Sequence, residues 1–458
     1  MKWTHPLSAQ VQEGPDLLGG KAHGLLTLKR LGLPVPAGFV ITTEACRAFR
    51  HGGRFPDGLR EEIAASVSAL EAETGRRFGD PRAPLTVSVR SGAGVSMPGM
   101  MTTVLNHDRP GEELERAVTD VFSSWDTPRA RTYRALNGIP DDLGTAVTVQ
   151  AMVHGDRDAR SGSGVAFTHD PNTGEHMPFG EALFGRQGDA VVSGSALTRP
   201  LRDLADREPS VWADLEAALN RVEAHYRDAC YVEFTYESGR LWLLQVRPAR
   251  LVGGAAVRTA VDLADAGVIG RAEALRRVSP HHLQHVRTPR VVLGEGGLPL
   301  ARGLGACPGV AVGRVATTPD RAVLMAAEGP VVLVRPETSP LDMRGLAVAA
   351  GIVTARGGPA SHAAVVARSM NTPAVVGVAE LTVGPDSIRV GGQLVPEGTL
   401  VTVDGTGGEM VLGEAPVTGG QTGPHLRRLL TWADEAAGGT GGGSDADRLR
   451  AARSALGS

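Results

Sequence analysis

The feature that most constrains the fold is a change of sequence pattern near residue 300. Before residue 250, apolar runs such as "LTVSVRSG" and "GTAVTVQAMVHG" are typical of strands, and one helix is expected over roughly Ser210–Ala229. Residues 251–300 are first helical and charged, and then become rich in Pro and Gly. From about residue 301, short β-type runs alternate with short helices. This change indicates several domains rather than one.

We therefore expect a multidomain chain that mixes α+β and α/β patterns. The first domain is predicted over residues 1–250, with two subdomains that divide near residue 106. A helical linker over 251–300, a second domain over 301–414 and a flexible tail with short helices over 415–458 are predicted to follow. A length of 458 residues fits two to four domains of about 150 residues each.

Charge and apolar patterning exclude several classes of partner. The formal net charge of −3 gives no sign of a nucleic-acid-binding surface. No uncharged apolar run is long enough for a transmembrane helix, and the N-terminal stretch lacks the apolar core of a signal peptide. Cys46, Cys230 and Cys307 are far apart and have no metal-ligand spacing. A reduced, cytoplasmic protein that binds neither nucleic acid nor membrane is expected.

The stretch "GGPASHAAVVARSM" predicts a histidine at the start of a helix. Ser361 or a near neighbour suits the N-cap, which places His362 in the first turn. The helix dipole there disfavours protonation of the ring, and the unpaired N–H groups and Arg356 favour a bound anion. His362 is thus a candidate carrier of a phosphoryl group. Two other interpretations stay open: a solvent-facing or capping histidine, and, less favoured, a metal ligand without a partner at ligand spacing.

A second set of candidates lies in the first domain, where a phosphate would meet backbone and basic groups. Only three basic residues are lysines, and Lys21 lies in "GPDLLGGKA". This stretch is not a Walker P-loop, because an extra residue precedes the lysine and Ala22 replaces Ser or Thr. Arg90 ends a strand and can hold phosphate through paired hydrogen bonds. The loop "SGAGVSMPGMM", with Ser91 and Gly99, suits closure over phosphates. A surface lysine and an ordinary turn are the alternatives.

The segment "CYVEFTYESGRLWLLQVRP" predicts a hairpin with polar groups on both strands. Glu233 and Gln245 can face the same way, and a carboxylate beside an amide oxygen suits Mg²⁺ that bridges two phosphates. Arg247 follows Gln245 at a spacing of two and shares its face. A solvated sheet face is the alternative interpretation.

Several of these stretches together resemble one enzyme family. "GIVTARGGPASHAAVVARSMNTPAVVG" resembles the phosphohistidine signature of the phosphoenolpyruvate-utilising enzymes, especially the pyruvate, phosphate dikinase family. "LLGGKAHGLLTLKRLGLPVPAGFVITTEAC", "VSVRSGAGVSMPGMMTTVLN" and "EFTYESGRLWLLQVRPAR" look like its nucleotide-binding half, and the similarity is collinear from about residue 14 to about 436. The resemblance implies an ATP-grasp-type nucleotide-binding domain followed by a swivelling phosphohistidine domain.

The same resemblance implies a reaction and a set of site residues. In the family, the histidine attacks the β-phosphate of ATP, inorganic phosphate removes the outer phosphate, and phosphohistidine remains. A barrel domain then binds pyruvate or phosphoenolpyruvate. By similarity, His362 is catalytic, and Mg²⁺ and ATP are the cofactors. The ATP-binding residues implied are Lys21, Arg90, Ser91, Gly99, Glu233, Gln245 and Arg247, of which Glu233 and Gln245 also hold the metal.

The chain departs from the family pattern at two positions. Tyr231 replaces an acidic residue two positions before Glu233, and a phenol cannot replace a carboxylate near magnesium at neutral pH. Ala360 stands where the plant dikinase has a threonine that can be phosphorylated, so that control is expected to be absent. The segment from Glu337 to Ser339, which includes Thr338, is expected to shape the docking face of the histidine domain.

The tail leads to three functional hypotheses. A barrel needs about 250 residues, and about 40 follow the second domain, so no pyruvate site is expected within this sequence. We favour a dikinase-like phosphotransferase that charges His362 and delivers the group to a separate acceptor, such as a pyruvate-binding barrel protein. A small-molecule phosphotransferase of the rifampicin phosphotransferase type is the second hypothesis. The third is a non-catalytic, ATP-binding regulatory remnant, for which Tyr231 is the main argument.

Overall fold

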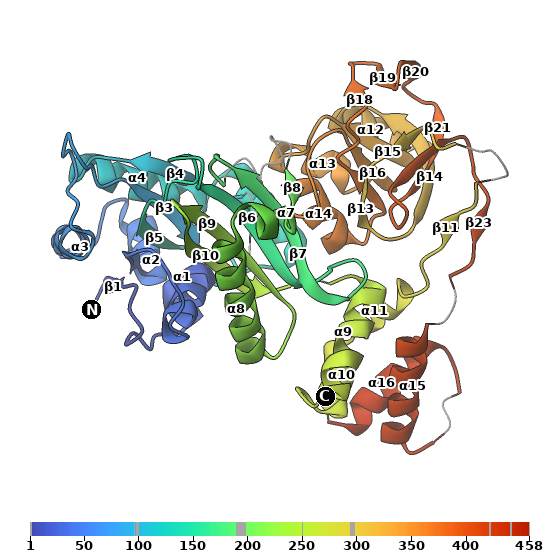
Figure 1. The fold of residues 1–458 in the computed structure, drawn as a ribbon, viewed down its shortest axis with the longest axis horizontal. Coiled ribbons are helices and arrows are strands. Elements are labelled where there is room, and N and C mark those ends of the chain that lie inside the picture. The colour runs from blue at the N-terminus through green and yellow to red at the C-terminus, as the bar shows by residue number, and fades with distance from the viewer. Residues whose placement is uncertain are drawn as a thin grey trace. The chain divides into compact units, whose positions relative to one another are not determined.

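A computed structural model describes residues 2–95, 97, 100–188, 198–249, 251–293, 298–420, 423–439 and 442–457 (Figure 1). It mixes helices and strands, as expected, and forms two compact units. The first comprises Met1–Ser161 and Val232–Arg247, and the second comprises Gly162–Tyr231 and Pro248–Ser458. The domain boundaries expected from sequence stay predictions. No helix among the described residues is both long and apolar enough to cross a membrane.

The first unit contains an antiparallel five-stranded sheet with the order β1-β2-β5-β3-β4. Its strands are β1 (Thr4–Pro6), β2 (Gly38–Ile41), β3 (Val87–Gly92), β4 (Thr103–His107) and β5 (Ala146–Ala151). The helices of this unit are α1 (Pro15–Arg30), α2 (Thr43–Gly52), α3 (Leu59–Thr74), α4 (Glu112–Ser124) and α5 (Pro128–Asn137). Val87 and Val89 of β3 pack in one core with residues of α2, α3 and α4. Because side chains alternate along a strand, Arg90 points to the other face of the sheet.

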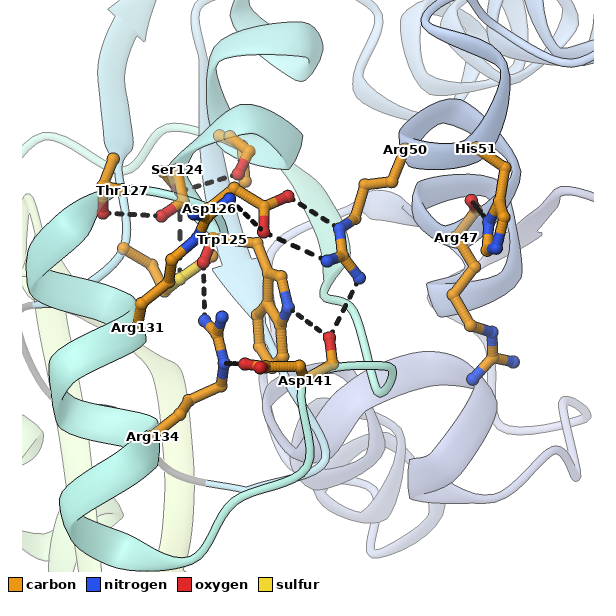
Figure 2. A network of polar contacts seen from close by, with 12 residues as sticks. Arg47, Arg50, His51, Ser124, Trp125, Asp126, Thr127, Arg131, Arg134 and Asp141 are labelled. Atoms are coloured by element: carbon orange, nitrogen blue, oxygen red, sulfur yellow. Dashed lines mark hydrogen bonds and ion pairs between the residues drawn. The ribbon is translucent and has the colours of Figure 1, made fainter.

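A polar network joins α2 to the segment between α4 and α5 (Figure 2). Arg50 binds both carboxylate oxygens of Asp126, with distances of 2.7 and 3.0 Å. The indole N–H of Trp125 donates to the carbonyl oxygen of Asp141 at 2.9 Å, and Arg134 binds the Asp141 carboxylate at 2.7 Å. The guanidinium of Arg134 also lies 4.4 Å from the centre of the Trp125 ring. These contacts fix the positions of neighbouring helices.

The expected hairpin forms through a two-residue turn between β9 (Cys230–Glu237) and β10 (Arg240–Pro248). Ser238 and Gly239 have φ values of 50° and 79°, as a tight hairpin turn of this length requires. The two strands belong to a second five-stranded sheet with the order β10-β9-β6-β7-β8. Its other strands are β6 (Gly162–His169), β7 (His176–Phe184) and β8 (Arg199–Pro200). They are followed by α7 (Asp203–Arg207) and α8 (Pro209–Tyr226), which confirms the single long helix expected near Ser210–Ala229.

An eight-stranded mixed sheet forms the C-terminal part of the second unit, in the order β12-β22-β21-β14-β15-β16-β17-β13. Its strands are β12 (Ala301–Arg302), β13 (Leu304–Cys307), β14 (Val310–Ala316), β15 (Val331–Arg335), β16 (Gly351–Thr354), β17 (Ala374–Val376), β21 (Leu400–Asp404) and β22 (Glu409–Leu412). The parallel strands β14 to β17 lie at its centre. Helices α12 (Pro319–Ala326), α13 (Met343–Leu346) and α14 (His362–Met370) pack on one apolar face.

The opposite apolar face of this sheet is covered by a small antiparallel sheet. Its strands are β18 (Leu381–Val383), β19 (Ser387–Val390) and β20 (Gln393–Pro396). Ile388 and Val395 pack against Val401 and Val403 of β21. Because both faces are buried, the central strands are nearly continuous apolar runs, as parallel strands in such a position require.

The segments on either side of this sheet pack on each other. Helices α9 (Gly253–Asp265), α10 (Arg271–Arg277) and α11 (Pro280–Gln284) share an apolar core with α15 (Pro424–Ala437) and α16 (Asp445–Ala455). Trp432 and Leu449 are buried in that core. Between these helices and the sheet, β11 (Arg290–Val291) pairs in antiparallel fashion with β23 (Val417–Thr418). The expected linker and tail therefore pack against each other. The segments that lead into and out of the eight-stranded sheet form the two-stranded ribbon of β11 and β23 (Figure 1).

Candidate functional site

A close contact between α1 and β3 positions Lys21. Gly19 has φ 74° and interrupts the regular helical conformation of α1. A Cβ at this position would lie 1.6 Å from the carbonyl oxygen of Gly92, so only glycine fits. The N–H of Gly20 donates to the carbonyl oxygen of Ala93 at 3.0 Å. As a result, the lysine that follows the two glycines lies against the end of β3, on the face that carries Arg90.

Three charged groups meet at this end of the sheet. Arg90 contacts the Glu233 carboxylate at 3.1 Å and the carbonyl oxygen of Leu244 at 3.4 Å, and the side chains of Arg90 and Glu233 are each 17% exposed. Burial and, to a smaller extent, the neighbouring Arg90 lower the pKa of Lys21 to about 7, while Glu233 acts in the opposite direction. Two basic groups and one carboxylate in a poorly solvated place leave an excess of positive charge, which an anion would balance.

The remaining residues expected at the nucleotide site lie on the same elements, with one exception. Ser91 follows Arg90 on β3 and is partly buried. Gln245 and Arg247 lie on β10, next to the strand that carries Glu233, and both are partly buried. Gly99 lies outside the described residues. The structure thus brings Lys21, Arg90 and Glu233 together, and it places the other three described residues on adjoining strands.

His362 is the first residue of α14, and Ser361 is the N-cap. The Ser361 hydroxyl accepts a hydrogen bond from the N–H of Ala364, which confirms the expected cap. The Nδ1 atom of His362 lies 3.0 Å from the hydroxyl of Thr338. The Nε2 atom is buried and has no hydrogen-bond partner among the described residues. Burial lowers the pKa of His362, against an opposing effect of Asp342, so the ring is neutral at pH 7.

Two ion pairs hold the loops around the imidazole. Arg356 contacts Glu337 at 2.9 Å, so the arginine expected to add charge beside the histidine is paired with a carboxylate. The buried Asp342 contacts Arg335 at 3.1 Å and accepts hydrogen bonds from the N–H and hydroxyl of Ser339. The segment around Thr338 is therefore fixed from both sides, which fixes the hydroxyl that contacts the ring.

A buried carboxylate from β7 holds the loop that precedes the histidine. Glu181 is 3% exposed and accepts a hydrogen bond from the N–H of Ala360 at 3.1 Å. It also accepts one from the hydroxyl of Thr198. A Cβ at Gly358 would lie 1.5 Å from a Glu181 oxygen, so the close approach requires glycine there. Burial raises the pKa of Glu181, and its hydrogen bonds act in the opposite direction.

Tyr231 occupies an apolar setting. It is 3% exposed, and its ring lies 5.0 Å from that of Phe167 in an edge-to-face arrangement. Val165, Leu183 and Ala360 belong to the same apolar cluster. The position that carries an acidic residue in the resembled family is thus part of a small core in this chain, where a carboxylate would be desolvated.

Sequence reasoning missed two contacts of His362 and its loop. It assigned Thr338 to a docking face, whereas the structure places the Thr338 hydroxyl on the imidazole. It gave no role to Glu181, because β7 carries Pro178 and Gly180 and lacks the regular alternation that indicates a strand. Both contacts join segments that are distant in sequence, so no local pattern reports them.

Comparisons with known proteins match two segments of the chain. Residues 51–200 match the family model for the pyruvate phosphate dikinase AMP/ATP-binding domain, and residues 327–408 match that for the mobile domain of PEP-utilising enzymes. Arg90 and Ser91 fall in the first match and His362 in the second. Lys21, Glu233, Gln245 and Arg247 lie outside both matched segments.

Curated relatives cover most of the chain. It is 35% identical to pyruvate, phosphate dikinase of Rhizobium meliloti, over 94% of this chain and 60% of the relative. It is also 35% identical to pyruvate, phosphate dikinase 2 of Oryza sativa, over 92% and 58%. For pyruvate, phosphate dikinase 1 of Arabidopsis thaliana the identity is 34%, over 92% and 53%. The chain thus spans 60% or less of the length of these three relatives. Two family models in chain order, and similarity along almost the whole chain, show that it is related to the pyruvate, phosphate dikinases and contains segments like their AMP/ATP-binding and mobile domains.

Proposed function

We propose that this chain is a phosphotransferase that takes a phosphoryl group from ATP onto His362 and delivers it to an acceptor bound outside residues 1–458. An ATP-grasp-type region with Lys21, Arg90 and Glu233 binds the nucleotide, and the domain that carries His362 moves between donor and acceptor. The observation that carries the proposal is the state of the imidazole of His362. Its Nδ1 atom contacts Thr338, and its Nε2 atom is buried without a hydrogen-bond partner among the residues that the structure describes.

The contact with Thr338 selects the reactive nitrogen. When Nδ1–H donates to the Thr338 hydroxyl, Nε2 keeps its lone pair and is the nucleophile. The lowered pKa of His362 keeps the ring neutral, and therefore nucleophilic, at pH 7. After transfer, the ring carries positive charge, and Thr338 continues to accept the Nδ1 hydrogen. Thr338 is thus a positioning residue for the catalytic histidine.

The proposed reaction has two steps. The Nε2 lone pair attacks the β-phosphorus of ATP, a bond from Nε2 to phosphorus forms, and AMP leaves with the bridging oxygen. An oxygen of inorganic phosphate then attacks the outer phosphorus, and pyrophosphate leaves while phosphohistidine stays. Lys21 and Arg90 would hold the phosphate oxygens whose charge changes in the first step.

The donor set beside Arg90 fits a hard divalent cation. Glu233 supplies a carboxylate and Gln245, on the adjoining strand, an amide oxygen, and Mg²⁺ prefers such oxygen ligands together with substrate phosphates. When bound, Mg²⁺ would neutralise phosphate charge. Tyr231, in its apolar cluster, takes no part in this set.

The proposal is tested with ATP labelled at the β-phosphate, followed by acid and base treatment of the protein. Label that is acid-labile and base-stable is expected on the wild type and absent from His362→Ala. His51→Ala, which changes a surface histidine of α2, is the matched control and should label normally. Equal labelling of His362→Ala would show that another residue carries the group.

The class of acceptor is tested by measuring AMP release with and without added acceptors. Release limited to one equivalent without an acceptor, and continuous release when a pyruvate-binding barrel domain is added, supports the proposal. Continuous turnover with a small-molecule acceptor would instead favour the rifampicin-type activity. Nucleotide binding without any label would favour a regulatory ATP-binding protein.

A further inference from the structure

A cluster of two histidines and a glutamate lies apart from the proposed phosphotransfer residues. His169 ends β6, His176 begins β7, and Glu223 lies in the last turn of α8. One nitrogen of each imidazole and one carboxylate oxygen all lie within 4.8 Å of one another. Among the described residues, this is the one group of three or more His, Cys, Asp or Glu side chains close enough to share an ion.

His169 has the hydrogen bonding of a metal ligand. It is 1% exposed, and its Nδ1 atom lies 3.3 Å from the carbonyl oxygen of Gly174, to which an Nδ1–H donates. That tautomer leaves a lone pair on Nε2, which is buried and without a hydrogen bond in the described part of the chain. Histidines that bind metals usually donate the other ring N–H to a carbonyl or carboxylate, which fixes the ring and its tautomer.

The Glu223 carboxylate lies between the two rings. One of its oxygens is 3.3 Å from Nε2 of His169, and the other is 3.3 Å from Nε2 of His176. The oxygen that faces His169 is buried. Ligand atoms that surround a tetrahedral zinc ion at about 2.0–2.1 Å lie about 3.3 Å apart. The two 3.3 Å contacts use different oxygens of Glu223, and one ligand atom from each residue lies within 4.8 Å of the others, so small side-chain movements would bring the three ligands to a shared ion.

We propose that His169, His176 and Glu223 bind a divalent transition-metal ion, with Zn²⁺ as the best-suited ion. Two imidazole nitrogens and one carboxylate oxygen form a ligand set that zinc accepts with a fourth, exchangeable water. Imidazole ligands favour zinc over Mg²⁺ and Ca²⁺, which prefer oxygen. The side chain of His176 is 62% exposed, so the ion has a path from solvent and the fourth position faces water.

The site lies at the base of the turn between β6 and β7, which gives the ion a mechanical role. In that turn, the side-chain amide of Asn172 donates to the carbonyl oxygen of Gly305 at 2.9 Å. Gly174 lies so close to α9 that a Cβ would be 2.6 Å from the carbonyl oxygen of Ala255. A bound ion joins β6, β7 and α8 and therefore holds this turn against α9 and the start of β13. Its effect is expected on stability, and it does not require phosphotransfer.

The test uses the full chain after a chelator has removed bound metal. Excess Mg²⁺ is added to occupy oxygen-rich sites, and Zn²⁺ binding is then measured by calorimetry and by thermal melting. One equivalent of Zn²⁺ and a higher melting temperature are expected for the wild type. His176→Gln should weaken binding at least about tenfold and remove most of the thermal shift. Because His176 is largely exposed, this variant keeps the fold.

His51→Gln removes a surface histidine elsewhere and is the control, with unchanged binding expected. X-ray absorption of the zinc-loaded protein should show two imidazole nitrogens among light-atom ligands. Two results would overturn the proposal: no stoichiometric binding by the wild type, or equal binding by the wild type and His176→Gln. Binding that persists in Glu223→Gln with unchanged affinity would also reject the ligand set.

Discussion

The first unit contains two clusters of arginine and carboxylate groups, which differ in how their charges are paired. In the cluster around Arg50, the guanidinium binds both oxygens of Asp126, and the neighbouring groups donate to Asp141 (Figure 2). In the cluster around Arg90, one carboxylate faces two basic groups, and the pKa of Lys21 falls to about 7. In the first cluster Asp126 and Asp141 are each bound by an arginine of their own, whereas in the second, among the described residues, Glu233 is the one carboxylate beside Arg90 and Lys21. This difference suits the first cluster to stabilising the fold and the second to the nucleotide-phosphate binding that we propose.

The largest expected effect is on catalysis. Lys21→Met and Arg90→Met should each slow phosphohistidine formation about 100-fold or more, because they remove groups that stabilise charge on the transferred phosphate. The melting temperature of Lys21→Met should stay the same or rise, since burial disfavours the charge that is removed, whereas Arg90→Met also removes the ion pair with Glu233 and should be less stable. Quenched-flow labelling and thermal melting measure the two quantities. A large loss of stability with normal labelling would mean that the two clusters do not differ in kind.

Asp126→Ala should produce the reverse pattern. It leaves the partly buried Arg50 without its carboxylate, and the expected loss is about 1.5–3 kcal/mol of unfolding free energy. The phosphorylation rate per folded molecule should not change. Chemical denaturation of the variant, with labelling as the second readout, distinguishes the outcomes. Slower labelling at full stability would assign a functional role to the Arg50 network.

A smaller effect is expected on the pH dependence of stability and on proton uptake during ATP binding. The folded-state pKa of Lys21 is about 7 and its usual value is 10.5, so between these pH values the unfolded chain holds a proton that the folded chain lacks. Unfolding free energy should therefore rise with pH from about 7 to about 10.5, and the destabilising contribution is fully present below pH 7. Phosphates bound beside Lys21 would raise its pKa, so ATP binding at pH 8 should take up part of one proton.

Calorimetry of ATP binding in buffers of different ionisation enthalpy measures this uptake. Lys21→Met should abolish it, whereas Asp126→Ala should leave it intact. Uptake that is equal in wild type and Lys21→Met would locate the titrating group elsewhere.

The smallest effect is expected at the edge of the Arg50 cluster. Arg131 lies 3.5 Å from Asp126, and its side chain is 64% exposed. Exposed pairs of this kind contribute about 0–1 kcal/mol and are screened by salt. Arg131→Ala should therefore change the unfolding free energy by less than about 0.5 kcal/mol at physiological salt. A loss as large as that of Asp126→Ala would show that the network acts as one cooperative unit.

Local patterns allowed much of the fold to be predicted. The strands β3 and β5, the hairpin of β9 and β10, and the N-cap Ser361 follow from apolar alternation, turn residues and capping preference. They could be predicted because each depends on neighbours in sequence. Strand β7 was missed because its Pro178 and Gly180 break that pattern. The tail was expected to be flexible, yet Trp432 and Leu449 are buried against the linker helices. Only tertiary packing gives that information.

The sequence allowed the residues of the candidate sites to be predicted, but not which of their side chains contact one another. Similarity to the dikinase family named Lys21, Arg90, Glu233 and His362, and the structure adds which groups touch. The hydrogen bond from Thr338 to His362 and the contact of Glu181 with Ala360 depend on how distant segments pack. The cluster of His169 and its partners is of the same kind, because a strand end, a strand start and a helix supply one group each.

The paired strands β11 and β23 place the entry and exit of the eight-stranded sheet next to each other, with Arg290 opposite Thr418. In topological terms, the portion between β11 and β23, which carries His362, is an inserted domain whose first and last residues lie next to each other. Domains with neighbouring termini tolerate insertion into other chains. A short turn that joins Val291 to Val417 would close the chain without it. The same geometry offers a point at which a different domain could be joined to the rest of this chain.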